Sequence, residues 1–211
     1  MKPCRGQWID ERHFAELASA EPDRLCAGGR ASYDPATGRY SIRIWNDDYT
    51  LDGKNRLVQL AQTDSQGTTK EANWFFTVFV IWYLLDPAAI TQSNIWVSEK
   101  DFPGGETFFR GPHQIPTAEV STACGEDLAR FTAACLHHGG EPVAMGDAAF
   151  RFVITPDIAV TMVYWLGDED FPAEAKLLFD QGMIGKLPLD MVFCLAVEVC
   201  QRLGRTASKG T

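Results

Sequence analysis

The sequence predicts an α+β protein, a single domain in which helices pack on an antiparallel sheet. The sheet is indicated by two apolar stretches, residues 149–154 and 158–165, which a short turn at 155–157 would join as a hairpin. The helices are indicated by an apolar run at 74–85 and an amphipathic pattern at 191–203. A chain of 211 residues, 45% of them hydrophobic, is long enough to bury about 70% of its unfolded surface in one core.

The N-terminal part of the chain alternates helix, turn and strand signals. Residues 8–20 have the pattern of an amphipathic helix. Residues 26–39 are expected to be a connection that ends in a turn with Pro and Gly, and the alternation at 39–45 predicts a strand. The acidic stretch 47–53 is expected to be a turn before a returning strand, and the polar segment 59–70 to be a loop.

The run at 74–85 is the most apolar segment of the chain. Its length falls short of the roughly 20 residues needed to cross a bilayer, so it predicts a core helix buried on nearly all sides. Its aromatic side chains are expected to pack in the core, and lining a cofactor pocket is the alternative. A short strand at 95–98 should follow, and then helices at 117–125 and 126–135, the second capped by the histidines at 137–138.

No linker rich in Ser, Gly or Pro divides the chain. We therefore expect residues 1–29 to form an N-terminal helix and lead-in, residues 30–203 to form the single α+β domain, and residues 204–211 to be a disordered tail.

The charge balance limits the class of partner. The chain has 19 basic and 28 acidic residues and a net charge of −9, which disfavours nucleic acid and anionic membrane surfaces. Residues 1–14 contain no apolar core of a signal peptide, so a cytoplasmic location is expected. The remaining partners are an unknown small molecule or an unknown protein.

The cysteines predict reduced thiols rather than disulfides or a metal site. None of the six lies in a Cys-x-x-Cys pair, and Cys194 and Cys200 would point in different directions on one helix. Neighbouring histidines also diverge on a helix, so no metal site is predicted from these residue types, and any cofactor is unknown.

The stretch from Ala159 to Asp180, AVTMVYWLGDEDFPAEAKLLFD, contains the main candidate site. If residues 149–165 form a hairpin, an acidic group would gather at one end of it beside Trp165. Its members are Asp147, Asp168, Glu169 and Asp170. Clustered carboxylates are relieved by a cation, by hydrogen-bond donors or by a raised pKa, so Asp147, Asp168 and Asp170 form a weak candidate site for Mg²⁺ or Ca²⁺. A solvated loop is the alternative.

A second candidate ligand site lies in the stretch 102–112. Gly104 and Gly105 would let the backbone approach a ligand closely, and Arg110 could contact an anion. An ordinary turn, with Arg110 paired to a surface carboxylate, is the alternative.

Several segments together resemble an uncharacterised bacterial family catalogued as a domain of unknown function (family number 3786). They are YDPATGRYSIRIWNDDYTL, FPGGETFF, GDAAFRF and WLGDEDFPAEAKLLFD, and the similarity covers roughly residues 30–203. The resemblance implies an origin in mainly anaerobic bacteria. Some longer relatives are labelled iron–sulfur proteins, but this chain has only Cys4 and Cys26 ahead of the shared region, too few for a cluster held by four thiolates.

These observations favour a binding or accessory protein of cytoplasmic, anaerobic metabolism with an acidic site. The alternative is an enzyme that uses the carboxylate cluster, with or without a divalent cation. No His, Ser or Lys at a telling spacing supplies a second catalytic group, so the enzyme ranks second.

Overall fold

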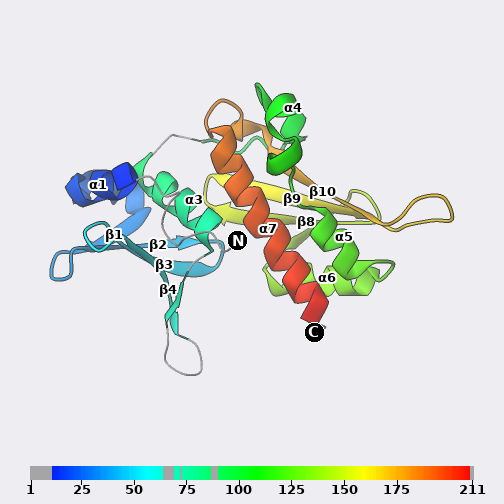
Figure 1. Ribbon diagram of the computed structural model, residues 1–211, viewed down its shortest axis with the longest axis horizontal. Coiled ribbons are helices and arrows are strands. Elements are labelled where there is room, and N and C mark those ends of the chain that lie inside the picture. The colour runs from blue at the N-terminus through cyan, green and yellow to red at the C-terminus, as the bar shows by residue number, and fades with distance from the viewer. Residues whose placement is uncertain (1–10, 64–68, 72, 87–89, 210–211) are drawn as a thin grey trace. The chain divides into compact units, whose positions relative to one another are not determined.

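The computed structural model describes residues 11–63, 69–71, 73–86 and 90–209 (Figure 1). It shows a mixed α+β fold with seven α-helices and two antiparallel sheets among these residues, which confirms the predicted fold class. The chain divides into two compact units, 1–87 and 88–211. The single-domain boundaries predicted for 30–203 stay a prediction, and each unit is described by itself.

The first unit contains a five-stranded antiparallel sheet in the order β1-β2-β3-β4-β5. Its strands are β1 (Ala31–Asp34), β2 (Arg39–Ile44), β3 (Asp47–Asp52), β4 (Leu57–Thr63) and β5 (Thr69–Glu71), and its helices are α1 (Glu11–Ser19), α2 (Pro22–Leu25) and α3 (Trp74–Leu85), with a 3-10 turn at Ala27–Gly29. In β2 the alternation is complete, because Tyr40, Ile42 and Ile44 are buried while Ser41 and Arg43 are exposed.

Helix α3 forms where the apolar run predicts it. Asn73 caps its N-terminus by accepting a hydrogen bond from the Phe75 amide at 3.1 Å. Eight of its twelve residues are buried, and Trp74 is the exposed one. Among the described residues, no helix is both long and apolar enough to cross a membrane.

Three predictions in this unit are wrong. The segment 47–52 is strand β3, because the turn lies at Trp45 and Asn46, whose φ values of 44° and 68° suit a two-residue hairpin turn. β4 and β5 occupy most of the expected loop 59–70, of which 64–68 lie outside the described residues. β1 lies in the expected connection 26–39. β1, β3 and β5 are short and rich in polar residues, so their hydrophobic pattern is weak.

The second unit contains an antiparallel sheet in the order β6-β10-β9-β8-β7, with α5, α6 and α7 on one face (Figure 1). Its strands are β6 (Trp96–Val97), β7 (Glu141–Val143), β8 (Ala148–Thr155), β9 (Ile158–Trp165) and β10 (Glu174–Asp180). Its helices are α4 (Gly105–Phe108), α5 (Ala118–Cys124), α6 (Leu128–His137) and α7 (Leu189–Lys209), with 3-10 turns at Glu99–Asp101, Gly111–His113 and Gln181–Met183.

The elements expected around the acidic stretch are present. β8 and β9 form the predicted hairpin, in which Phe152 pairs with Val160. The predicted helices are α5, which ends at Gly125, and α6, which Asp127 caps by accepting from the Arg130 amide at 2.9 Å. The first seven residues of β9 are buried, and all of them except Thr161 are hydrophobic.

Residues 204–209 differ from the prediction of a disordered tail at 204–211, because helix α7 continues to Lys209. Ala207 is buried, and the helix approaches α5 at Gly204, where a Cβ would come within 3.1 Å of the Glu119 carbonyl oxygen. Close packing against α5 therefore orders a segment whose polar composition indicated disorder.

Candidate functional site

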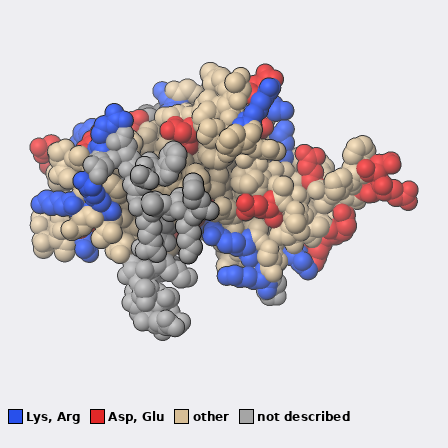
Figure 2. Space-filling model, in the orientation of Figure 1, with Lys and Arg blue, Asp and Glu red and all other residues tan. Residues whose placement is uncertain are grey.

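The acidic turn lies in the long loop between β9 and β10, and acidic side chains mark the end of this loop in Figure 2. Asp168 closes the turn, because its Oδ1 accepts hydrogen bonds from the amides of Asp170 at 2.9 Å and Phe171 at 2.8 Å. Glu169 and Asp170 are exposed. Local backbone amides thus stabilise the negative charge of the Asp168 carboxylate.

Asp147 is placed beside the end of β9. Its Oδ2 accepts from the Leu166 amide at 2.8 Å, and its own amide donates to the Tyr164 carbonyl oxygen at 2.9 Å. Trp165, which is 38% exposed, ends the strand. In the described part of the chain, no three His, Cys, Asp or Glu side chains are grouped so that they could hold a metal ion, so Asp147, Asp168 and Asp170 do not assemble into a cation site there.

We expect Asp168→Asn and Asp170→Asn to change the free energy of unfolding by no more than about 0.5 kcal/mol each, as measured by urea denaturation. Asparagine keeps the Oδ1 acceptor that closes the turn, and Asp170 is exposed. A loss above about 2 kcal/mol in either variant would contradict this local role of the turn.

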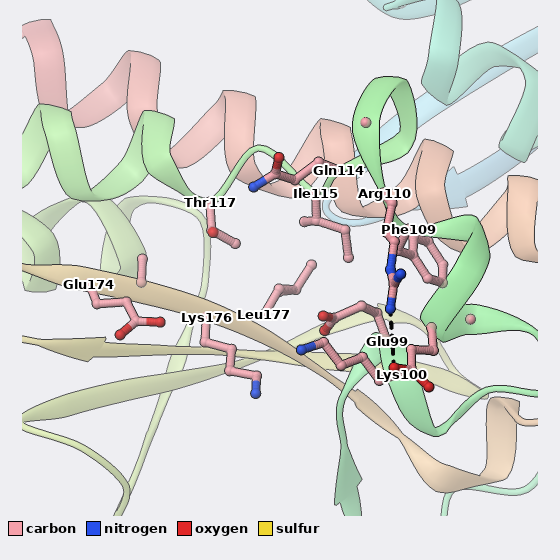
Figure 3. Close-up of a pocket in the computed structure, with 14 residues that line it drawn as sticks. Glu99, Lys100, Phe109, Arg110, Gln114, Ile115, Thr117, Glu174, Lys176 and Leu177 are labelled. Carbon is pink, nitrogen blue, oxygen red and sulfur yellow. Dashed lines mark hydrogen bonds and ion pairs between the residues drawn. The ribbon is translucent and has the colours of Figure 1, made fainter.

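A pocket of about 450 Å³ lies along one edge of β10, and we call it the β10 pocket (Figure 3). One wall comes from residues around α4, the second from the connection to α5, and the third from β10 itself. The lining residues are Glu99, Lys100, Gly105, Glu106, Phe109, Arg110, Gly111, Gln114, Ile115, Thr117, Glu174, Ala175, Lys176 and Leu177. Gly105 and Arg110 were predicted as ligand contacts, and Gly104 adjoins them.

The α4 wall is built by a tight approach of backbone to backbone. Ser98 and Asp101 form a capping box, in which the Asp101 carboxylate accepts from the Ser98 amide at 2.7 Å and the Ser98 hydroxyl at 2.8 Å. Gly104 then adopts a φ of 80°, and Gly105 lies so close to the Glu99 carbonyl oxygen that a Cβ would overlap it. The two glycines therefore shape this wall of the pocket, and their contact with a ligand stays a prediction.

The β10 wall has two different faces. Ala175 and Leu177 are buried and point to the helix side, whereas Glu174 is exposed and Lys176 is half-buried. In Figure 3, Leu177 points toward the side of Ile115, and Glu174 and Lys176 point the other way. β6 pairs only with Phe179 and Asp180, so the edge of β10 along the pocket carries no neighbouring strand among the described residues.

Charges of both signs line the β10 pocket. Arg110 pairs with Glu106 at 3.1 Å, an exposed pair of small energetic weight. In the described part of the chain, no ion pair engages the side chains of Glu99, Lys100, Glu174 and Lys176. The pKa of Asp101 is lowered by its hydrogen bonds with Ser98 and further by the positive charge of Lys176.

The β10 pocket is lined by charged, polar and apolar side chains. The lining residues include no His, Cys or Ser, and the Glu106 carboxylate accepts a hydrogen bond from Arg110. Its apolar floor at Ala175, Leu177 and Ile115 and its charged rim are typical of a site that orients a polar ligand.

Fold and site together define an α+β protein with two antiparallel-sheet units and a charged pocket at an open sheet edge. The chain belongs to the family described as Domain of unknown function (DUF3786), which it matches over residues 21–202. This confirms the resemblance at the level of the family. No curated protein matches the chain, and no solved structure matches it either.

Sequence reasoning missed most of the pocket. Glu99, Lys100, Gln114 and Lys176 were not candidates, because nothing in the local pattern around each of them differs from an ordinary surface position. The available signal was the pair of adjacent glycines, which marked the α4 wall.

Proposed function

We propose that this chain is a binding or accessory protein whose ligand occupies the β10 pocket and carries charges of both signs. One observation supports this most strongly: cationic and carboxylate side chains line the same recess, and four of them (Glu99, Lys100, Glu174 and Lys176) make no ion pair within the described residues. A ligand with both charges would complete these pairs while its apolar part rests on Leu177 and Ile115.

The alternative function, an enzyme built on the acidic turn, has less support. The carboxylates of Asp147 and Asp168 already accept hydrogen bonds from the backbone amides of Leu166, Asp170 and Phe171, none of which is a second catalytic group. The acidic turn is therefore not part of the proposed site, and its residues 168–170 serve as a control region when binding is measured.

A cytoplasmic location belongs to the same proposal, as does a role in anaerobic bacterial metabolism, which the family resemblance implies. The location is supported by free thiols at Cys26, Cys124, Cys135, Cys194 and Cys200. Burial raises the pKa of Cys124 to about 11 and that of Cys194 to about 12, so these thiols are protonated and inert at neutral pH. Unbonded cysteines are usual in reducing compartments.

The proposal is tested by amide NMR spectra of the full chain during titration with zwitterions: free glutamate, free lysine and the dipeptide Glu-Lys. We expect chemical-shift changes at Lys100, Gly105, Arg110 and Lys176. They should saturate at millimolar ligand, because desolvating the charges of a small ligand weakens its binding. The double variant Lys100→Glu, Lys176→Glu should weaken binding at least tenfold, since it reverses two cations of the lining.

The matched control is Lys186→Glu, which reverses an exposed lysine outside the pocket and should leave the titration unchanged. Spectra that do not respond to any zwitterion or to any peptide would refute the proposed function. Chemical-shift changes confined to residues 168–170 would also refute it and would indicate that the acidic turn is the ligand site.

A further inference from the structure

The open edge of β10 is the feature of the pocket that a small polar ligand would leave unused. β6 pairs with Phe179 and Asp180, and the chain then leaves the sheet at Ser98 to form the 3-10 turn at Glu99–Asp101. The β10 residues that line the pocket, 174–177, lie directly beyond the point where β6 ends. A backbone edge of this kind is a template for pairing with another strand.

The ladder determines which backbone groups face the pocket. One step beyond the Asp180–Trp96 pair, the Gln181 amide donates to the Ile95 carbonyl oxygen at 2.8 Å. Residues that exchange hydrogen bonds across one edge alternate along an antiparallel strand. The backbone N–H and C=O groups of Phe179, Leu177 and Ala175 therefore point to the β6 side.

The opposite side of the sheet gives the same alternation. The Tyr164 carbonyl oxygen accepts from the Asp147 amide at 2.9 Å, so the backbone of Tyr164 faces β8. Its neighbours Val163 and Trp165 must then face β10, where they pair with Lys176 and Glu174. Ala175 and Leu177 are thus left with N–H and C=O groups directed at the pocket, without a hydrogen-bond partner there among the described residues.

We propose that the ligand is an extended peptide segment of a partner protein, which adds to β10 as an antiparallel strand in line with β6. This inference rests on the proposed function, because it names the ligand class of the same pocket. Two backbone pairs, at Leu177 and Ala175, supply the main-chain hydrogen bonds of strand addition.

The side chains of β10 define the sequence that fits. A residue opposite Leu177 or Ala175 shares the buried, helix-side face and should be apolar. A residue opposite Lys176 should be acidic, and one opposite Glu174 should be basic, because opposite charges are favourable across a strand pair. Read from its N-terminus, the antiparallel segment is apolar, acidic, apolar, basic.

A second copy of the chain fits this edge less well than a peptide. If β10 paired with itself about Lys176, two lysines would face each other. If it paired about Ala175, Glu174 and Lys176 would match in both directions, but the ladder would be very short, because β10 begins at Glu174 and Val97 already lies opposite Phe179. A single strand of about four residues avoids both conflicts.

The direct test uses the peptide acetyl-Thr-Val-Glu-Val-Lys-Thr-amide with the full chain, followed by amide NMR and calorimetry. We expect the largest shifts at Ala175 and Leu177. N-methylation of the two valines should weaken binding at least tenfold, because it removes the N–H groups that face β10. N-methylation of the Glu and the Lys is the matched control and should change affinity less than threefold, since those N–H groups point away.

A charge swap tests the register. Lys176→Glu should weaken binding of this peptide about tenfold. The variant protein should instead prefer a peptide with Lys in place of its Glu. The control Lys186→Glu should bind both peptides as the parent chain does. Zwitterion binding without peptide binding would overturn the inference and leave the proposed function standing, as would equal affinity of all N-methylated forms. Sedimentation showing a dimer whose formation protects the Ala175 and Leu177 amides would overturn it in favour of a second copy.

Discussion

We expect Asp180→Asn to lower the free energy of unfolding by about 3 kcal/mol, as measured by urea denaturation at pH 7. Asp180 ends β10 and is fully buried, with an exposed fraction of 0%. Asparagine has the same shape but replaces one acceptor oxygen by an NH₂ group. That group would face donors, so one or more buried amides would lose their partner.

The expected size follows from what the carboxylate holds together. Its oxygens accept from the amides of Ser93 at 2.8 Å, Asn94 at 2.7 Å and Gly182 at 2.8 Å, and from the Ser93 hydroxyl at 2.9 Å. These bonds join the end of β10 to the segment that leads into β6. Hydrogen bonds to a charged group are about twice as strong as neutral ones, and each orphaned buried amide adds its own desolvation cost.

The same carboxylate makes stability depend on pH in a defined direction. Burial alone would raise the pKa of Asp180, but the hydrogen bonds from Ser93, Gly182 and Asn94 outweigh it, so the folded-state pKa is lowered. A lowered pKa contributes stability above the unfolded value of about 3.9, and this contribution is lost as pH falls through the folded pKa. The difference in unfolding free energy between wild type and Asp180→Asn should therefore be constant above about pH 5 and should shrink as the pH falls below about 4.

Asp170→Asn is the matched control, because it makes the same chemical change at an exposed loop position. It should leave the unfolding free energy and its pH dependence within about 0.5 kcal/mol of wild type. If Asp180→Asn behaved like this control, the buried network would not contribute to stability as described.

The parts of the fold that the sequence predicted are those with a strong one-dimensional pattern. The twelve-residue apolar run became α3, and the paired apolar stretches became β8 and β9. The turn at Trp45 and Asn46 was missed because tryptophan rarely adopts a positive φ, whereas the acidic residues after it are common in turns. β10 was not assigned from the sequence, although Ala175, Leu177 and Phe179 alternate as its buried face.

The candidate site was harder to predict, for a physical reason. The acidic turn stood out because its carboxylates are adjacent in sequence, but the fold satisfies Asp147 and Asp168 with backbone amides. The β10 pocket instead combines Lys100, Arg110 and Lys176, which lie on different elements and meet only through tertiary structure. The free backbone edge has no signature in side-chain identity at all, since it depends on where β6 ends.

Gly105→Ala should lower the free energy of unfolding by about 2 kcal/mol and abolish ligand binding in the β10 pocket. A Cβ at this position would overlap the Glu99 carbonyl oxygen and would lie 3.3 Å from the Cβ of Phe102. The obstructing oxygen is backbone, and the Ser98–Asp101 capping box fixes the turn that carries it. Phe102 in turn is buried edge-on against Phe179, so relief requires α4 to move away from the sheet.

Movement of α4 would carry Phe109 and Arg110 with it, which is why binding should fail even in the fraction that stays folded. The comparison is Gly104→Ala at the preceding residue. There the added Cβ would lie 3.7 Å from Leu189 Cδ1, an ordinary contact, and the cost is the left-handed φ of 80°, about 1 kcal/mol. Urea denaturation and the zwitterion titration should therefore separate the two variants, with Gly105→Ala losing more stability and all binding. Equal losses in both would show that backbone conformation, rather than the contact between Gly105 and Glu99, maintains the pocket wall.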